Sequence, residues 1–193
     1  MNRRQDKILE KSPGRRKDPV TKYKKIVIAA FIAIILALGL YYFYPISKIP
    51  SHVTIDNIVV IKSKHQLLAY SQGRLIAIYK ISIGKNPVGN KEYEGDQKTP
   101  EGIYKIDSKN PHSDFHKNLG ISYPNEEDIR NSRQLGKPPG GDIKLHGLKN
   151  GQEYLGKFQR WMDWTNGCIA LTNDEMDELY DHTPVGTRIE IRK

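Results

Sequence analysis

The alternation of apolar and polar positions predicts a domain built mainly of β-strands. Apolar residues recur at every second position through Leu75–Ile83, which is the pattern of a half-buried strand. Shorter β-branched or alternating runs lie on either side, separated by turn residues such as Ser71-Gln72-Gly73. The predicted strands cover residues 58–61, 66–70, 75–83, 103–106, 142–147 and 188–192.

Helical patterns are few and short. We predict helices at 126–135, ended by Pro138-Pro139, and at 152–158. A third helix is expected in the acidic run that follows Thr172 or Asn173, either of which suits the N-cap. Residues 84–95 and 107–120 are polar and rich in turn formers, which favours loops. The predicted fold class is mainly β with short helices, a curled sheet or sandwich.

One apolar run does not fit this domain. Ile26–Tyr44 contains no charged residue, and about 17–25 apolar residues suffice to span a bilayer. Tyrosines 41, 42 and 44 cluster at its far end, where interfacial aromatic residues are common. The run is longer than the apolar region of a signal peptide and lacks the small-residue cleavage site. A core helix is also disfavoured, because the run is apolar all the way round. We predict a transmembrane signal anchor.

The positive charge is concentrated before this run. Residues 1–25 carry ten Lys/Arg and three Asp/Glu, whereas the remainder carries 21 and 19. This distribution predicts a cytoplasmic tail and an extracytoplasmic outer domain. It disfavours a nucleic-acid partner, since the basic tail borders a membrane span. The predicted organisation is a basic tail (1–25), an anchor (26–44), a linker (45–54) and a catalytic domain (55–193).

Cys168 is the only cysteine, so it forms no intramolecular disulfide and no Cys-pair zinc site. Asn166-Gly167 predicts a turn immediately before it. A tight turn near a helix start is typical of a lowered thiol pKa. Two interpretations follow from the residues alone: an inert buried thiol or a nucleophile. Outside the membrane a lone thiol is exposed to oxidation, which favours a chemical role.

A cysteine nucleophile needs a base and oxyanion donors. His146 ends a predicted strand, precedes Gly147, and is the strongest candidate base among six histidines. The backbone N–H groups of Gly167 and Cys168 are the candidate oxyanion donors. His112 and His116 would have metal-ligand spacing in a helix, but their neighbours favour a loop and no third ligand is apparent. We expect neither a metal nor another cofactor.

These residues resemble the signature of the L,D-transpeptidase (YkuD-type) catalytic domain family. The resemblance lies in His146-Gly147, in Thr165-Asn166-Gly167-Cys168, and in the stretch from Gly84 to Ile106. It covers about residues 58–192, so it implies that family's β-sandwich-like catalytic domain. The transmembrane helix predicted from the apolar run precedes this domain.

The resemblance also implies an activity. It makes Cys168 the nucleophile that attacks the third residue of a peptidoglycan stem peptide and forms a thioester. It makes His146 the proton acceptor and donor, with the Gly147 carbonyl bracing the imidazole. Thr165, Asn166 and Gly167 are supporting residues of the same motif. The partners implied are stem peptides and, through the anchor, the cytoplasmic membrane.

Ala170 departs from the family pattern, because most members carry Arg at this position. The flanking residues, and the stretch Asn110–Asn125, look closer to the YafK-like branch, which includes a hydrolytic amidase. Hydrolysis, as an L,D-carboxypeptidase or a murein-lipoprotein amidase, is therefore the alternative to transpeptidation. Lys144 or Arg160 could supply the missing cation. A catalytically dead wall-binding module is disfavoured, since it would need neither Cys168 nor His146.

Overall fold

The computed structural model describes residues 19–44 and 48–193. Most of the predicted basic tail (1–18) and the start of the predicted linker (45–47) lie outside the described residues. The chain divides between Phe43 and Tyr44 into an N-terminal unit and a larger C-terminal unit.

The N-terminal unit contains helix α1, Pro19–Phe43. Within its stretch Lys22–Phe43, an 18-residue window has a mean hydropathy of 2.7, and none of that window is buried. Apolar side chains point outward all round this helix, which a water-exposed helix would not tolerate. By length and composition α1 is a candidate for a transmembrane span, as the sequence predicts.

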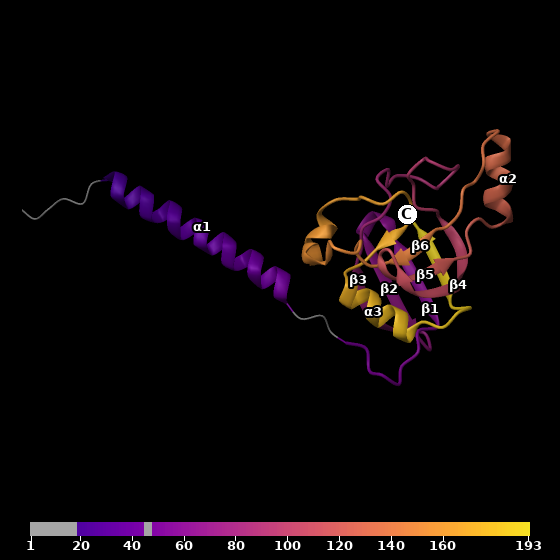
Figure 1. The fold of residues 1–193 in the computed structure, drawn as a ribbon, viewed down its shortest axis with the longest axis horizontal. Coiled ribbons are helices and arrows are strands. Elements are labelled where there is room, and N and C mark those ends of the chain that lie inside the picture. The colour runs from indigo at the N-terminus through magenta and orange to yellow at the C-terminus, as the bar shows by residue number, and fades with distance from the viewer. Residues whose placement is uncertain (1–18, 45–47) are drawn as a thin grey trace, which may run out of the picture. The chain divides into compact units, whose positions relative to one another are not determined.

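Eight strands in the C-terminal unit form one mixed sheet in the order β3-β2-β1-β8-β4-β5-β6-β7. The strands are β1 Asn57–Ile61, β2 Gln66–Ser71, β3 Arg74–Lys80, β4 Gly102–Ser113, β5 His116–Ile121, β6 Lys144–His146, β7 Ile169–Ala170 and β8 Arg188–Arg192. The last strand pairs in parallel with the first and antiparallel with β4. In Figure 1 the C-terminal strand, in yellow, accordingly runs beside the violet strand β1.

The sheet curls until its two edges meet. Strand β4 pairs with β8 near its start and with β5 further along, and its register shifts after Ile106. Such irregularities bend a strand and increase its twist. Past the end of β3, Ser82 exchanges two backbone hydrogen bonds with Ala170 of β7, at 3.0 and 2.8 Å. The two ends of the strand order are thereby joined.

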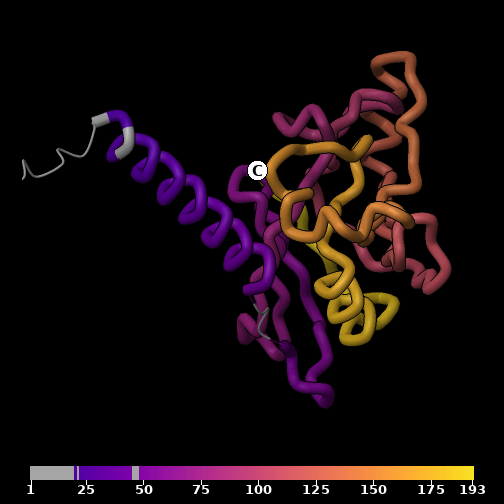
Figure 2. The backbone as a smooth tube through the Cα atoms, turned by 60° about the vertical axis from the view of Figure 1, so that its left-hand side comes forward, coloured from indigo at the N-terminus to yellow at the C-terminus, as the bar shows by residue number. Residues whose placement is uncertain are grey.

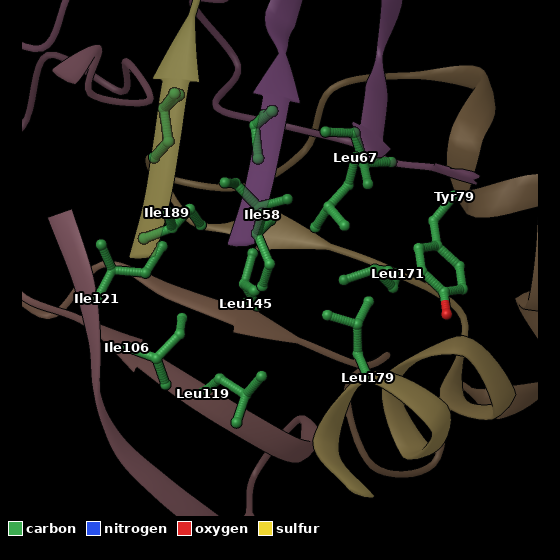
Figure 3. Close-up of a cluster of buried hydrophobic side chains, with 14 of the residues drawn as sticks. Ile58, Leu67, Tyr79, Ile106, Leu119, Ile121, Leu145, Leu171, Leu179 and Ile189 are labelled. Atoms are coloured by element: carbon green, nitrogen blue, oxygen red, sulfur yellow. The ribbon is translucent and has the colours of Figure 1, made fainter. Parts of the chain in front are cut away.

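The core lies inside this curl. Figure 3 shows Ile58, Leu67 and Ile189, from one half of the sheet, facing Ile106 and Leu119 from the other half. Leu179 of helix α3, Asn173–His182, closes one side of the cluster. Side chains buried to this degree typically cost about 2–5 kcal/mol when truncated to alanine. The predicted mainly-β fold with short helices is confirmed.

Four short helical segments complete the described part of the domain. Figure 2 follows the backbone from the violet β1–β2 hairpin to α3 in yellow. Helix α2 covers Glu126–Gln134 and η1 covers Lys62–Lys64. Thr172 is the N-cap of α3 and forms a capping box with Glu175, so the first of the two predicted caps is used. The helix predicted at 152–158 is instead a 3₁₀ segment, η2, Glu153–Trp161, broken at Gly156, where φ is 44°.

The loop predicted at 107–120 is wrong. Strand β4 continues to Ser113 and β5 begins at His116, so this segment is a hairpin. It is stabilised by pairing, because β5 has neighbours on both sides, and by burial of Leu119 and Ile121. Pro111 is tolerated where the β4–β5 register is irregular, between Asn110 and Ser113.

Candidate active site

The structure brings Cys168 and His146 to neighbouring strands. Strand β6 ends at His146, and Cys168 directly precedes β7. The two strands are parallel, with Leu145 opposite Ile169 and His146 opposite Ala170. Both side chains line one cavity of about 630 Å³. Its wall also includes Lys85, Asn110, His112, Ser113, Asp114, Phe115, Asn118, Asp142, Lys144, Lys149, Gln152, Trp164, Thr165 and Asn166.

The imidazole of His146 is held in one orientation. Its Nδ1 lies 2.7 Å from the carbonyl oxygen of Gly147, so Nδ1 carries the proton and donates it. The ring packs 4.8 Å from Phe115 and 5.6 Å from Trp164, measured between centroids. These contacts leave Nε2 as the basic nitrogen.

Gly147 occupies a position with no room for a side chain. A Cβ there would lie 2.7 Å from Oδ1 of Asn173 and 2.9 Å from Cβ of His116. Its N–H donates to the carbonyl of Phe115 at 3.1 Å. The residue after the histidine therefore ties β6 to the β4–β5 turn and lies closely against the start of α3.

Burial shifts the pKa values of the two candidate catalytic groups in opposite directions. It lowers the pKa of His146, and nearby Lys144 lowers it further, against the opposing effect of the Gly147 hydrogen bond. It raises the pKa of the Cys168 thiol, assisted by Asp142 and opposed by the backbone of Lys144. The predicted lowering of the thiol pKa is wrong. The physical reason is burial of the thiol, and β7 also separates Cys168 from the start of α3 at Asn173.

The turn before Cys168 is fixed by Thr165. Its Oγ1 donates to the carbonyl of Cys168 at 2.7 Å and accepts from the N–H of Gly167 at 3.1 Å. Gly167 has φ 134°, and a Cβ there would lie 2.7 Å from the carbonyl oxygen of Lys98. Only glycine fits this backbone without strain.

The Thr165 contact changes the predicted oxyanion donors. The N–H of Gly167 is already engaged, so the predicted pair is not free. The N–H of Cys168 has no acceptor in the described part of the chain. One of the two predicted donors is thus available to a reacting carbonyl oxygen.

A sequence profile described as YkuD, L,D-transpeptidase catalytic domain, matches residues 55–191. The chain belongs to this family. A curated relative in Bacillus subtilis, named "Putative L,D-transpeptidase YqjB", is 28% identical over 139 residues, or 69% of each chain. "Putative L,D-transpeptidase YafK" of Escherichia coli is 29% identical over 112 residues, which are 56% of this chain and 37% of that protein.

Among solved structures, the helical cell shape determining protein Pgp2 of Campylobacter jejuni is similar, with 25% identity and a TM-score of 0.54. The match covers 74% of this chain and 49% of Pgp2, so this chain spans about half of that protein.

Within this L,D-transpeptidase fold, Ala170 is fully buried in β7. Arg160, proposed above as a substitute cation, forms an ion pair with Glu175, and both side chains are largely buried. Lys144 lines the cavity but pairs with Asp142 at 2.6 Å. Lys85 and Lys149 also line the cavity, and the pattern-based analysis missed both.

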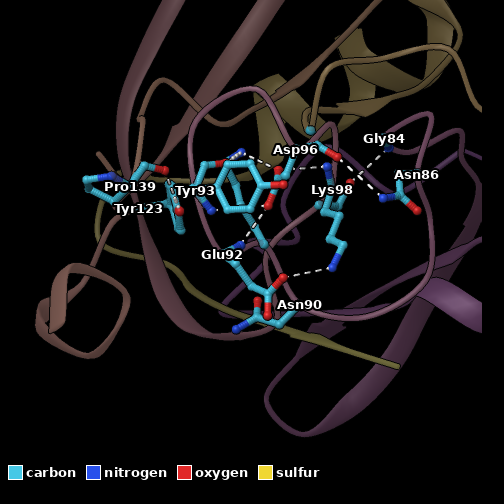
Figure 4. A network of polar contacts seen from close by, with 12 residues as sticks. Gly84, Asn86, Asn90, Glu92, Tyr93, Asp96, Lys98, Tyr123 and Pro139 are labelled. Carbon is cyan, nitrogen blue, oxygen red and sulfur yellow. Dashed lines mark hydrogen bonds and ion pairs between the residues drawn. The ribbon is translucent and has the colours of Figure 1, made fainter. Parts of the chain in front are cut away.

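The loop from Gly84 to Glu101 is a scaffold for the cysteine turn (Figure 4). Asp96 accepts from the ammonium of Lys91 at 2.8 Å and from three backbone N–H groups, those of Glu92, Tyr93 and Lys98. Burial raises the pKa of Asp96, but these hydrogen bonds outweigh it, so the pKa is lowered overall. The network places the carbonyl of Lys98 against Gly167.

Three of the remaining histidines form contacts outside the catalytic pair, and His112 is part of the cavity wall. His116 pairs with Asp177 at 2.6 Å, His65 pairs with Asp163 at 2.9 Å, and His182 contacts the carbonyl of Val53 at 2.6 Å. His112 lies on β4 and His116 on β5, so they lack the helical spacing of a metal pair. Within residues 19–44 and 48–193, no three metal-ligating side chains come together.

Proposed function

We propose that this protein is a cysteine-dependent acyltransferase of peptidoglycan stem peptides. The observation that carries the proposal is the arrangement of Cys168 and His146 on neighbouring strands, in one cavity, with Nδ1 of His146 held by Gly147. This is the nucleophile, base and orienting group that thiol catalysis needs. Family membership supports stem peptides as the substrate class.

In the first half-reaction the thiol of Cys168 attacks the carbonyl at the L-centre of the third stem residue. Its proton passes to Nε2 of His146 as the S–C bond forms. The N–H of Cys168 stabilises the oxyanion of the tetrahedral intermediate. The C–N bond then breaks, and the terminal D-alanine leaves with the proton from His146. The product is a thioester on Cys168.

In the second half-reaction a nucleophile releases the acyl group. His146 accepts a proton from an amine of another stem, which attacks the thioester and forms a cross-link between the third residues of two stems. The thiol leaves as the S–C bond breaks and regains its proton from His146. Attack by water in place of the amine gives the free tripeptide.

Transpeptidation is our main proposal, and hydrolysis is the alternative. The case for hydrolysis depends on the cation missing at Ala170, which would weaken a charge-assisted contact worth about 1.5–3 kcal/mol. The cavity has its own cations, because Lys85 and Lys149 line it beside the Lys144–Asp142 pair. A carboxylate on an incoming stem can therefore still find a positive partner.

We further propose that α1 anchors the protein in the cytoplasmic membrane with the catalytic domain outside. The uncharged run and the basic excess before it support this orientation. An extracytoplasmic domain would meet its polymeric substrate in the wall.

The test is a product analysis. The full-length protein in detergent is incubated with disaccharide-tetrapeptide, and products are separated by mass. Cross-linked dimer supports transpeptidation, and tripeptide without dimer supports hydrolysis. Unchanged tetrapeptide, in the presence of added acceptor stems, would contradict both.

A further inference from the structure

Asn118 is a largely buried polar residue of the cavity whose carboxamide is unpaired within the described part of the chain. Its exposed fraction is 5%, and it lines the cavity that contains Cys168 and His146. Within the described chain, no side chain or backbone group forms a hydrogen bond with its carboxamide. Its carboxamide is not among the fully enclosed unpaired polar groups of the described chain, so it opens onto the cavity, where a bound ligand can pair with it.

The position of Asn118 is fixed by the sheet. It lies on β5 directly opposite His146 of β6. Directly opposite residues on antiparallel strands share a face, with Cβ atoms about 4.5–5.5 Å apart. Cys168 approaches His146 from the other neighbouring strand, β7. Asn118 and Cys168 therefore reach the cavity from opposite sides of β6, with Cys168 directly before β7.

The other asparagine side chains nearby are already engaged. Oδ1 of Asn110 accepts from the N–H of His112 at 2.8 Å, and Oδ1 of Asn166 accepts from Lys85 at 3.3 Å. Asn150, beside the β4–β5 turn, both accepts from His116 and donates to Ser113. Asn118 differs from all three in having its carboxamide free.

We propose that Asn118 is a substrate-binding residue that pairs with a peptide group of the acyl donor. This inference rests on the proposed function. A carboxamide donates and accepts at once, which matches the N–H and C=O of a peptide group. A carboxylate of the donor would instead favour the lysines of the same cavity. Contact beside His146 would hold the donor with its scissile carbonyl within reach of Cys168.

The proposed role predicts that Asn118→Leu affects activity without lowering stability. Asn118→Leu keeps the approximate size of the side chain and removes no hydrogen bond within the protein, so the melting temperature should hold or rise. Loss of the two neutral hydrogen bonds to the substrate should lower kcat/KM by at least roughly ten-fold. If Asn118 served only to stabilise the fold, Asn118→Leu would instead lower the melting temperature.

The experiment uses the full-length protein in detergent. Wild type, Asn118→Leu and the control Asn57→Leu are compared by thermal melting and by kcat/KM with disaccharide-tetrapeptide. Asn57 lies on β1 outside the cavity, where its Oδ1 accepts from Arg188 at 3.0 Å. The control should keep wild-type kcat/KM. Unchanged kcat/KM in Asn118→Leu, or a fall that tracks a lower melting temperature, would overturn the proposal.

A binding measurement tests the role of Asn118 independently of the proposed reaction. Binding of the free tetrapeptide is measured with Cys168→Ala, with and without Asn118→Leu. If the wild type proves inert but binding weakens by at least roughly ten-fold with Asn118→Leu, the proposed reaction fails and the inference stands. If the wild type turns over and Asn118→Leu changes neither binding nor kcat/KM, the inference alone fails. Absence of both binding and turnover overturns the two together.

Discussion

Burial keeps both groups of the proposed catalytic pair uncharged near neutral pH. It raises the pKa of the Cys168 thiol and lowers the pKa of the His146 imidazole. A preformed thiolate–imidazolium pair would require shifts in the opposite directions. Proton transfer should therefore accompany attack on the carbonyl, with Nε2 of His146 as the acceptor.

The pH dependence follows from these directions. Because only the thiolate is alkylated and its pKa is raised, labelling of Cys168 by iodoacetamide should be slow at about pH 7 and increase beyond about pH 8.5. Because the pKa of His146 is lowered, the base stays neutral and kcat/KM should hold until the pH falls below about 6.5. Labelling is followed by intact mass across the pH range. A labelling rate that is already maximal at about pH 6 would contradict a neutral pair.

Substitutions of the pair should act on chemistry and leave folding intact. We expect Cys168→Ala to abolish turnover and Cys168→Ser to come close, since a hydroxyl is far less acidic than a thiol. His146→Ala should lower kcat by about 10²–10⁴-fold. His52→Ala is the control, because His52 is exposed and outside the cavity. Substantial turnover by Cys168→Ala would rule out the nucleophile.

At the scale of elements, the cysteine turn depends on one glycine. Gly167→Ala should destabilise the domain by about 2–4 kcal/mol and lower activity, because the added Cβ meets the Lys98 carbonyl and φ is 134°. Gly141→Ala is a matched control, since a Cβ there has open space. Chemical denaturation gives the free energy of unfolding of both variants. Equal stability of the two variants would show that the turn can relax.

The buried Lys91–Asp96 pair should contribute much more than an exposed pair of the same loop. Asp96→Ala leaves a buried ammonium without its partner and should cost about 3–5 kcal/mol. Glu92→Ala breaks the exposed pair with Lys98 and should cost about 0–1 kcal/mol. The folded-state pKa of Asp96 is lowered, so its contribution is complete above about pH 4 and is lost as the pH falls through the folded value. Unfolding curves of the wild type and the two variants, measured across pH, give the loss of unfolding free energy in each variant.

Elements with strong local patterns were predictable, and those made by pairing were not. The alternation in 75–83 and the cap at Thr172 depend on neighbours in sequence, and both lead to the observed elements. The alternation ends in β3 at Lys80, because Ile81–Ile83 leave β2 for the β7 edge. The β4–β5 hairpin has polar residues and a proline, and its stability comes from strands far along the chain.

The same distinction applies to the site. Cys168, His146 and the turn between Thr165 and Gly167 carry residue types that indicate chemistry by themselves. Phe115 and Asn118 do not, because an aromatic residue and an asparagine acquire a role only when the β4–β5 hairpin is placed beside His146. Resemblance of Asn110–Asn125 to the YafK-like branch indicated the segment but not these two residues.

At the scale of the whole molecule, the helix and the domain should separate cleanly. Ile49 is buried in the domain core and its N–H donates to Glu178, so packing begins inside the predicted linker. A chain starting at residue 48 should be soluble and should melt at the temperature of the domain in the full-length protein. The full-length protein should sediment with membranes, and a reporter that works only outside the cytoplasm should be active when fused after Lys193. Recovery of the full-length protein from a detergent-free cytosolic fraction would contradict the anchor.

The central claim is a thioester on Cys168, and intact-protein mass spectrometry tests it most directly. The full-length protein is mixed with disaccharide-tetrapeptide, quenched in acid and weighed, with Cys168→Ala in parallel. We expect the wild type to gain the mass of the acyl donor minus D-alanine, with the adduct mapped to Cys168 and released by hydroxylamine. The alanine variant should gain nothing. Turnover of tetrapeptide without any such adduct, or the same adduct on the alanine variant, would contradict this account.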